Sequence, residues 1–384
     1  MWREWQRPLA VGVLGTIVLR LVAEWVALVS QFGVAFPHLV ARRPGTLINV
    51  WNHWDAGYYA SIAQYGYPGH HPETLHARGS LAFPPLYPAG MAVVHALTGI
   101  DYIAAGLLLS TLATMAALAG LYRLGILDGA VERGRVSVVL LLAWPAAFFL
   151  IAPYPESLAL ALGVFAFLAA RSERLLLAGC LAAAASLTKY YLVVIAIALL
   201  VEVWTSQSER RLRTVRTLTR LSSVVVPTVL VFSGWMIYLF VRTGSAISFL
   251  HAQATLWNRH FAFPWTLAHH TASDLVHWRF LDTIAAVTEL FDAVTVVLLA
   301  IVAVYCYLRV RKSYGVLLGL GWCVYCFETV LMSETREVLV LFPFFIGLGA
   351  WAVRGRWREP LLLALFIPCA YFLLERFVQG RFAG

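Results

Sequence analysis

Long apolar runs separated by short polar segments make up most of this chain. The runs approach the roughly 20 residues that an α-helix needs to cross a bilayer, and they recur to the end of the sequence. The pattern therefore predicts an all-α, polytopic membrane protein with about eleven spans. The expected spans cover residues 8–36, 102–122, 136–152, 156–170, 175–188, 190–204, 223–241, 283–308, 314–332, 338–353 and 360–378.

The polar segments between the runs are too short and too aromatic to form independent domains. The sequence thus predicts a single transmembrane domain over residues 1–384, with exterior loops near 37–101 and 242–282. Residues 81–99 carry three prolines in their first third, so they are expected to form an exterior or re-entrant segment instead of a plain span. The first apolar run has no clear small-residue cleavage site and is expected to remain a membrane helix.

Composition strengthens the membrane assignment: 61% of the residues are hydrophobic and the mean hydropathy is +0.76. The net charge of +9 does not indicate nucleic-acid binding, because the basic residues form short clusters between apolar runs. Of the 29 lysines and arginines, 18 fall on the same side of the membrane as the N-terminus. Because cytoplasmic segments are enriched in basic residues, this excess places the N-terminus in the cytoplasm. They are Arg3, Arg7, Arg123, Arg133, Arg135, Arg171, Arg174, Arg210, Arg211, Arg213, Arg216, Arg220, Arg309, Arg311, Lys312, Arg354, Arg356 and Arg358.

All eleven histidines then lie in or next to exterior segments, so the exterior side is polar, aromatic and titratable. The expected location is the plasma membrane, with any chemistry at the exterior face. The cytoplasmic segments show neither a Walker loop nor a dinucleotide fingerprint.

One carboxylate, Asp55, lies among aromatic residues just after the first span. At helical spacing a single face would carry Trp51, Trp54, Asp55, Tyr58 and Ile62. An acid on that face suits proton chemistry in a cavity at the membrane edge. The other interpretation is an interfacial helix anchored by its aromatic residues, with an incidental carboxylate.

Further candidates lie at other exterior turns. Tyr87, in a proline-rich segment, offers a hydroxyl but equally suits a structural wall. Glu156 falls in the first turn of a predicted helix, as a cap or as a ligand and second acid. Lys189 needs an anion, either a carboxylate or a substrate phosphate. The planar guanidinium group of Arg336 can donate two hydrogen bonds to a phosphate. A salt bridge to Glu334 or Glu337 would equally pair its charge.

The exterior loop 242–282 holds Trp257, Arg259 and His260 and suits a lid over a lipid-linked substrate. Its adjacent pair His269-His270 is a poor metal motif, because neighbouring residues on a helix point apart. No metal site is expected.

Taken together, these segments resemble the PIG-V type of mannosyltransferases, which belong to the GT-C class of multispanning glycosyltransferases. The order and spacing of several short motifs carry the resemblance from about residue 50 to the end. The motifs are Trp54-Asp55 with Tyr58, Ile62-Ala63 and Gly66-Tyr67; Ala82-Phe83-Pro84 with Tyr87-Pro88; Pro145-Ala146 and Phe148-Phe149 with Tyr154 and Glu156-Ser157-Leu158; Ser333 and Arg336 with Phe342-Pro343; and Phe377, Gly380 and Gly384.

The resemblance implies the GT-C fold, a polyprenyl-phosphate-mannose donor, inverting transfer at the exterior face, no metal or other cofactor, and Asp55 as the catalytic acid-base residue. Two positions depart from the family pattern. Glu337 replaces a tyrosine after Arg336, and the sequence around Lys189 differs from the expected one. The acceptor of the eukaryotic enzymes does not carry over.

The resulting hypothesis is an inverting glycosyltransferase that moves mannose to a lipid-linked or glycolipid acceptor, with Asp55 as general base. The donor phosphate is expected to contact Lys189, Arg336, Arg259 and His260, and the substrates Trp54, Tyr58, Tyr87, Glu156 and Trp257. The alternative is a lipid or glycolipid transporter or flippase. Such a protein would be expected to show internal repeats, and the sequence shows no convincing one.

Overall fold

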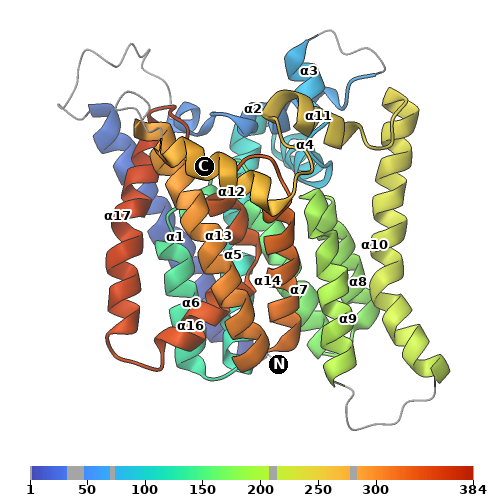
Figure 1. Cartoon of the computed structure of the whole chain (residues 1–384), viewed down its shortest axis with the longest axis vertical. Helices are drawn as coiled ribbons and strands as arrows, with labels where there is room; N and C mark the ends of the chain where they lie inside the picture. The colour runs from blue at the N-terminus through green and yellow to red at the C-terminus, as the bar shows by residue number, and fades with distance from the viewer. Residues whose placement is uncertain (1, 33–46, 70–73, 207–213, 277–282, 384) are drawn as a thin grey trace.

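The computed structural model describes residues 2–32, 47–69, 74–206, 214–276 and 283–383 (Figure 1). Helices joined by turns make up this part of the chain, apart from one isolated β-bridge between Phe261 and Glu328. The α-helices are α1 (Trp2–Phe32), α2 (Asp55–Tyr65), α3 (Leu75–Ser80), α4 (Leu86–Thr98), α5 (Tyr102–Leu127), α6 (Val131–Ala143), α7 (Glu156–Arg171), α8 (Leu175–Ser186), α9 (Val194–Ser206), α10 (Thr214–Thr243), α11 (Ser248–Trp257), α12 (Pro264–Val276), α13 (Thr283–Arg309), α14 (Lys312–Cys326), α15 (Glu334–Glu337), α16 (Pro343–Ala352) and α17 (Arg358–Val378). The 3₁₀ helices are η1 (Leu47–Trp51), η2 (Ala147–Leu150), η3 (Tyr190–Val193) and η4 (Val338–Val340). The all-α prediction is confirmed for these residues.

Within the described residues, five helices are long and apolar enough to cross a membrane: α1, α5, α10, α13 and α17. The pair formed by α15–η4 and α16 passes the same test only as one broken span, bent by 89°. The helices α7, α8, α9 and α14 overlap most of the predicted segments 156–170, 175–188, 190–204 and 314–332, whereas α6 ends nine residues before the predicted end of 136–152. All five helices are only 12 to 16 residues long. The predicted count of eleven spans is therefore not confirmed, although the chain has the helices of a multi-pass membrane protein.

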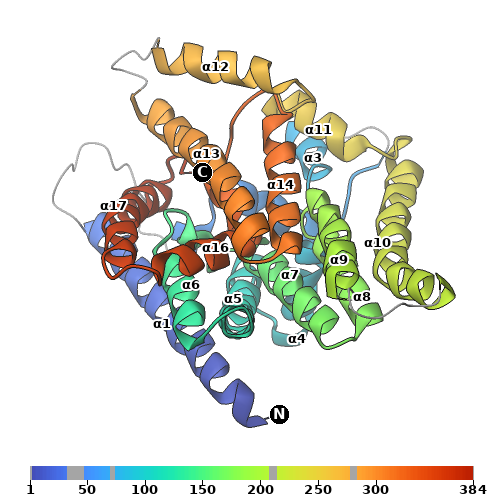
Figure 2. The same ribbon diagram turned by 60° about the horizontal axis from the view of Figure 1, so that its bottom comes forward.

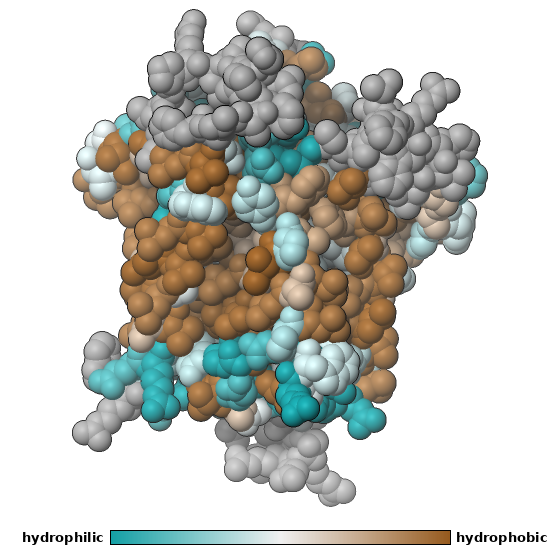
Figure 3. All heavy atoms as spheres, turned by 90° about the vertical axis from the view of Figure 1, so that its left-hand side faces the viewer, coloured by the Kyte–Doolittle hydropathy of each residue, from teal (hydrophilic) through white to brown (hydrophobic). Residues whose placement is uncertain are grey.

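The long helices run side by side between two ends of the molecule (Figure 1). One end carries the short helices α2, α3, α11 and α12, and the other carries the start of α1 and the turn between α16 and α17. We call the first the cavity end, because the cavity of the candidate site lies there, and the second the basal end. The helix α10 stands at the edge of the bundle, against α8 and α9 (Figure 2). Figure 3 shows a broad apolar band on one side of the bundle, with a polar zone below it at the basal end.

Segments with basic residues meet at the basal end, as the arginine pattern predicts. Arg123, at the end of α5, pairs with Glu4 near the start of α1. Arg135, at the start of α6, pairs with Glu359 at the start of α17, with 2.7 Å between Nη2 and Oε2. These contacts place the helix ends on one side of the bundle, while the orientation of that side in a membrane stays a prediction.

The proline-rich segment 81–99 forms α4, a helix of 13 residues that packs against α2 and α5. Pro84 and Pro85 precede the helix and Pro88 lies in its first turn, where a missing N–H breaks no helical hydrogen bond. At about 1.5 Å per residue, the helix is too short to cross a bilayer. The segment is thus not a plain span, as predicted.

Candidate functional site

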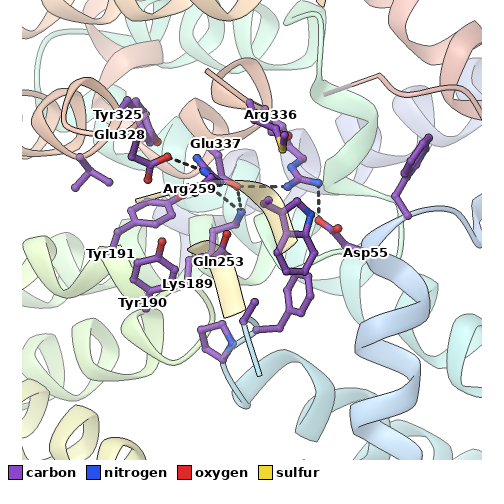
Figure 4. Close-up of a pocket in the computed structure, with 18 of the residues that line it drawn as sticks. Asp55, Lys189, Tyr190, Tyr191, Gln253, Arg259, Tyr325, Glu328, Arg336 and Glu337 are labelled. Atoms are coloured by element: carbon purple, nitrogen blue, oxygen red, sulfur yellow. Dashed lines mark hydrogen bonds and ion pairs between the residues drawn. The ribbon is translucent and has the colours of Figure 1, made fainter. Parts of the chain in front are cut away.

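A cavity of about 350 Å³ lies among the segments at the cavity end of the bundle. Its walls come from segments far apart in the sequence: the start of α2, the segment before α4, η3, the end of α11, and the stretch from α14 to α15. In Figure 4, Asp55 lies on one side and Arg259 with Glu328 on the opposite side. Arg336, Glu337 and Lys189 lie between them. The cavity thus combines both signs of charge inside a largely apolar bundle.

Asp55 enters the cavity from the first residue of α2. The expected single helical face from Trp51 to Ile62 is wrong, because the helix is interrupted before Asp55. Trp51 belongs to η1 and is buried, and Trp54 has a positive φ of 51°. The Tyr154 hydroxyl donates to the His53 carbonyl oxygen at 2.8 Å, so a tertiary contact fixes the chain at this break. In the first turn of α2, the helix dipole stabilises the Asp55 carboxylate.

Arg336 connects Asp55 to the interior of the site. Its Nη1 donates to Oδ2 of Asp55 at 2.9 Å, and its Nε lies 3.3 Å from Oε1 of Glu156. The guanidinium carbon lies 5.2 Å from the centroid of the Phe149 ring and 5.4 Å from that of Tyr154, within range of cation–π attraction. Arg336 is therefore held on several sides, and its position in turn holds the Asp55 carboxylate.

Lys189 lies deeper, just before η3, and is 7% exposed. Its ammonium group donates to both carboxylate oxygens of Glu337, at 2.7 and 2.8 Å, and lies 3.0 Å from Oε1 of Glu156. Tyr191 donates a further, short hydrogen bond to Glu337. Of the two partners expected for Lys189, the structure shows the carboxylates.

These five charged residues form what we call the cavity cluster: Asp55, Glu156, Lys189, Arg336 and Glu337. When all are ionised, the cluster holds three carboxylates and two cations. Both cations are already paired, so an anionic ligand must compete with a carboxylate for them. The assignment of Lys189 and Arg336 to a donor phosphate stays a prediction.

Arg259 supplies a third cation on the far side of the cavity. Its Nε donates to Oε2 of Glu328 at 2.6 Å, and its Nη2 lies 3.5 Å from Oε1 of Glu334. Burial lowers the pKa of Arg259, but the surrounding acidic groups, with Glu328 and Glu334 foremost, together outweigh that effect and hold the pKa above its ordinary value. Burial raises the pKa of Glu328, and Arg259 opposes only part of the rise. Arg259 therefore remains charged in the cavity wall.

The other predicted substrate residues divide into two groups. Trp54 and Trp257 line the cavity. Tyr58 lies behind the wall, stacked on His76 with 4.4 Å between ring centroids, and it also contacts Trp257. Glu156 lies beneath the floor, fully buried.

Tyr87 and His260 are not among the residues that line the cavity in the described structure. The Tyr87 hydroxyl is buried between Ser110 Oγ, at 2.7 Å, and the Gly106 carbonyl oxygen, at 3.1 Å, where it joins α4 to α5. The His260 backbone N–H donates to Thr329, and its side chain is exposed. Their predicted contacts with substrate and phosphate stay predictions, and neither side chain lies in the cavity wall.

Several lining residues were not predicted as part of the site: Gln253, Glu328, Glu337 and Phe382. Glu337 did carry a signal, since a carboxylate at the start of an apolar run needs a cation. From the sequence, however, Glu337 is expected only as an ion-pair partner of Arg336. Phe382 follows the last apolar run and no periodicity marks it.

The described residues contain no group of three or more histidine, cysteine, aspartate or glutamate side chains that could hold a metal ion. The expected independence from metals and other cofactors stays a prediction.

No protein-family model and no curated protein matches the sequence. Among solved structures, the chain is similar in fold to the oligosaccharyltransferase of Archaeoglobus fulgidus in its apo form, with a TM-score of 0.47 and 10% identity. The same enzyme, AglB, in complex with an inhibitory peptide and a dolichol-phosphate gives a TM-score of 0.45 and 11% identity. Each match covers 96% of this chain and 56% of the other, so the chain spans little more than half of the protein it matches.

Over its described residues, the chain is an all-helical protein with the long apolar helices of a multi-pass membrane protein.

Proposed function

We propose that this protein is an inverting glycosyltransferase that moves mannose from polyprenyl-phosphate-mannose to a lipid-linked or glycolipid acceptor. The observation that carries the proposal is the position of Asp55. Its carboxylate faces a cavity at one end of an apolar bundle, beside aromatic rings and three cations. The choice of mannose, the GT-C class and the PIG-V type rest on the resemblance of the sequence motifs.

Asp55 acts as general base in this mechanism. It takes the proton from an acceptor hydroxyl while that oxygen attacks C1 of the donor sugar. The bond from C1 to the phosphate oxygen breaks, and the polyprenyl phosphate leaves with the electron pair. A single displacement inverts the configuration at C1 and needs only one base. Arg336 donates a hydrogen bond to Oδ2 of Asp55 and so orients the carboxylate for this step.

Lys189, Arg336 and Arg259 are the proposed partners of the leaving phosphate, whose charge they would stabilise. Two features support this role: all three line the cavity, and none is more than 14% exposed in its side chain, so water screens them weakly. His260 follows Arg259 in the chain, but its side chain is exposed. It would therefore contact the phosphate only from the outer edge of the cavity. The prenyl tail would lie along the apolar helices, as a lipid does.

We place the protein in the plasma membrane with the cavity on the exterior face. The support is the gathering of basic residues at the basal end, since cytoplasmic segments of membrane proteins are enriched in lysine and arginine.

Purified protein in lipid vesicles tests the proposal directly. The vesicles would contain radiolabelled polyprenyl-phosphate-mannose and a membrane lipid extract, and the Asp55→Asn variant serves as the matched control. We expect a new labelled lipid with the wild type and not with the variant. Labelled donor that crosses the bilayer intact, without a new product, would instead identify a transporter or flippase and end the proposal.

A further inference from the structure

The segment after α17 returns to the cavity and forms part of its wall. The chain reverses at Gly380, where φ is +72°, and Phe382 then lines the cavity. A side chain at residue 380 would be strained by that φ, and its Cβ would lie only 3.3 Å from the ring of His53. The turn therefore depends on glycine.

Hydrogen bonds hold this returning segment in place. The Gly380 N–H donates to the Phe377 carbonyl oxygen and the Arg381 N–H to the Arg376 carbonyl oxygen, each at 2.9 Å. The Arg376 side chain then donates through Nε to the Phe382 carbonyl oxygen, also at 2.9 Å. Ala383, the next residue, is 1% exposed. The segment is thus packed as a fixed wall.

Phe382 packs on Trp54, the residue directly before Asp55. The two ring centroids lie 5.5 Å apart, with the planes at 87°. Trp54 has φ 51° and ψ −119°, and its side chain is half exposed. A non-glycine residue in such a conformation costs on the order of 1–3 kcal/mol, so its surroundings must hold it there. The contact with Phe382 is one of the interactions that do so.

The charges show which substrate meets these rings. Arg259 lies on the opposite side of the cavity from Asp55, and Lys189 lies between them (Figure 4). Arg336, the third proposed phosphate partner, lies between Asp55 and Lys189. A phosphate held by Lys189 and Arg259, with Arg336 at its near edge, lies on the side of the cavity away from Asp55 and from the adjacent Trp54. The hydroxyl that gives up its proton must come within about 2.6–3.2 Å of Asp55. The group that carries this hydroxyl therefore lies against the rings.

We propose that Trp54 and Phe382 form the acceptor subsite and bind the apolar C–H face of a sugar ring in the acceptor. This inference rests on the proposed function and deepens it: the acceptor would be a glycolipid with a sugar at its reacting end. The planes of the two rings are nearly at right angles, so one ring can present its face and the other its edge to a ligand. Such a rigid corner fits a sugar ring better than a flexible alkyl chain. Phe382 is then a specificity-determining residue about which the sequence pattern gave no hint.

Steady-state kinetics with donor and acceptor varied separately test the subsite. The labelled product of the vesicle assay identifies the acceptor as its unlabelled precursor lipid. That precursor is purified from the extract for these measurements. For Phe382→Ala we expect the acceptor KM to rise about 3–10-fold, as for a lost aromatic contact, while the donor KM stays unchanged. Phe382→Tyr keeps the ring and should restore the acceptor KM.

Phe263→Ala is the matched control, because Phe263 is an exposed aromatic residue at the same end that does not line the cavity. Thermal unfolding of each variant separates an effect on the subsite from an effect on the fold. An unchanged acceptor KM in a folded Phe382→Ala variant, or an equal rise in both KM values, overturns the inference. Absence of transfer by the wild type overturns the proposed function itself.

Discussion

Two clusters of buried charge lie at opposite ends of the bundle and differ in composition. The basal cluster joins Asp128 and Glu202 to Arg171 and Arg311, at distances of 2.8–3.3 Å, and Tyr314 donates to Asp128 at 2.7 Å. Two carboxylates thus face two arginines, and each carboxylate contacts both. The basal cluster is balanced and closed on itself.

The cavity cluster has three carboxylates for two cations, and Asp55 is its open member. The Asp55 side chain is 16% exposed, lines the cavity and pairs with Arg336. Glu337 also lines the cavity but is only 6% exposed and is held by Lys189, while Glu156 is fully buried beneath. A closed, neutral network ties helix ends together. A network with an extra carboxylate at a cavity keeps one acid available for proton transfer. The paired charges of the basal cluster thus stabilise the fold, whereas the extra carboxylate of the cavity cluster is suited to proton transfer.

The largest expected effect comes from removing the open acid. Asp55→Asn keeps the shape of the side chain but removes the base, so the transfer rate should fall by about 10²–10⁴-fold. Turnover of labelled donor measures the loss, and the unfolding midpoint should change little. A variant with nearly normal turnover would show that Asp55 is not the base and that the two clusters do not differ in the way described.

The matching change in the basal cluster should affect stability instead. Glu202→Gln leaves Arg171 and Arg311 with one carboxylate fewer in a mostly buried site, which should lower stability by about 3 kcal/mol. Thermal unfolding in detergent reports the loss, and turnover per folded molecule should stay at the wild-type level. A selective loss of turnover would mean that the basal cluster also takes part in the reaction.

Arg336→Lys probes how far geometry, as opposed to charge, matters in the cavity cluster. Lysine keeps the positive charge, but it lacks the planar fork that reaches Asp55 and Glu156 together. Losing a hydrogen bond to a charged group should reduce kcat/KM for the donor about 10- to 100-fold. Equal kinetics for the two proteins would leave Arg336 with a purely electrostatic role.

The smallest effect is expected at the surface of the basal end. Arg135 pairs with Glu132 and Glu359, but its side chain is 45% exposed. Water screens such pairs, so Arg135→Ala should change stability by less than about 1 kcal/mol. Thermal unfolding provides the measurement. A loss as large as that of Glu202→Gln would mean that burial does not explain the strength of the basal cluster.

Much of the fold could be predicted because it depends on hydrophobic runs. The predicted span 102–122 corresponds to α5 and 360–378 to α17, each within a few residues. Span number was harder to predict, since helices such as α8 are shorter than a bilayer requires and hydropathy alone does not show how they are arranged. Local periodicity also failed between Trp51 and Asp55, where a hydrogen bond from Tyr154, about a hundred residues later, fixes the chain.

The site was partly predictable for a similar reason. Charged residues at the ends of apolar runs had to find partners, which pointed to Asp55, Lys189 and Arg336. The pairing of Lys189 with Glu337 depends on how distant helices meet, and no pattern in a single sequence encodes it. The same limit applies to Phe382, which reaches the cavity only because the chain turns back at Gly380.

The broken span at α15 has a consequence for the synthesis of the protein. Arg336 meets Asp55 across 281 residues of sequence, and Glu337 meets Lys189 across 148. As the chain emerges, Lys189 and Glu156 can already pair with each other, but Asp55 is made long before Arg336. An unpaired charge in an apolar environment costs several kcal/mol, so the start of α2 cannot reach its final packing before residue 336 is made. Assembly of the cavity end is thus completed only when the last eighth of the chain arrives.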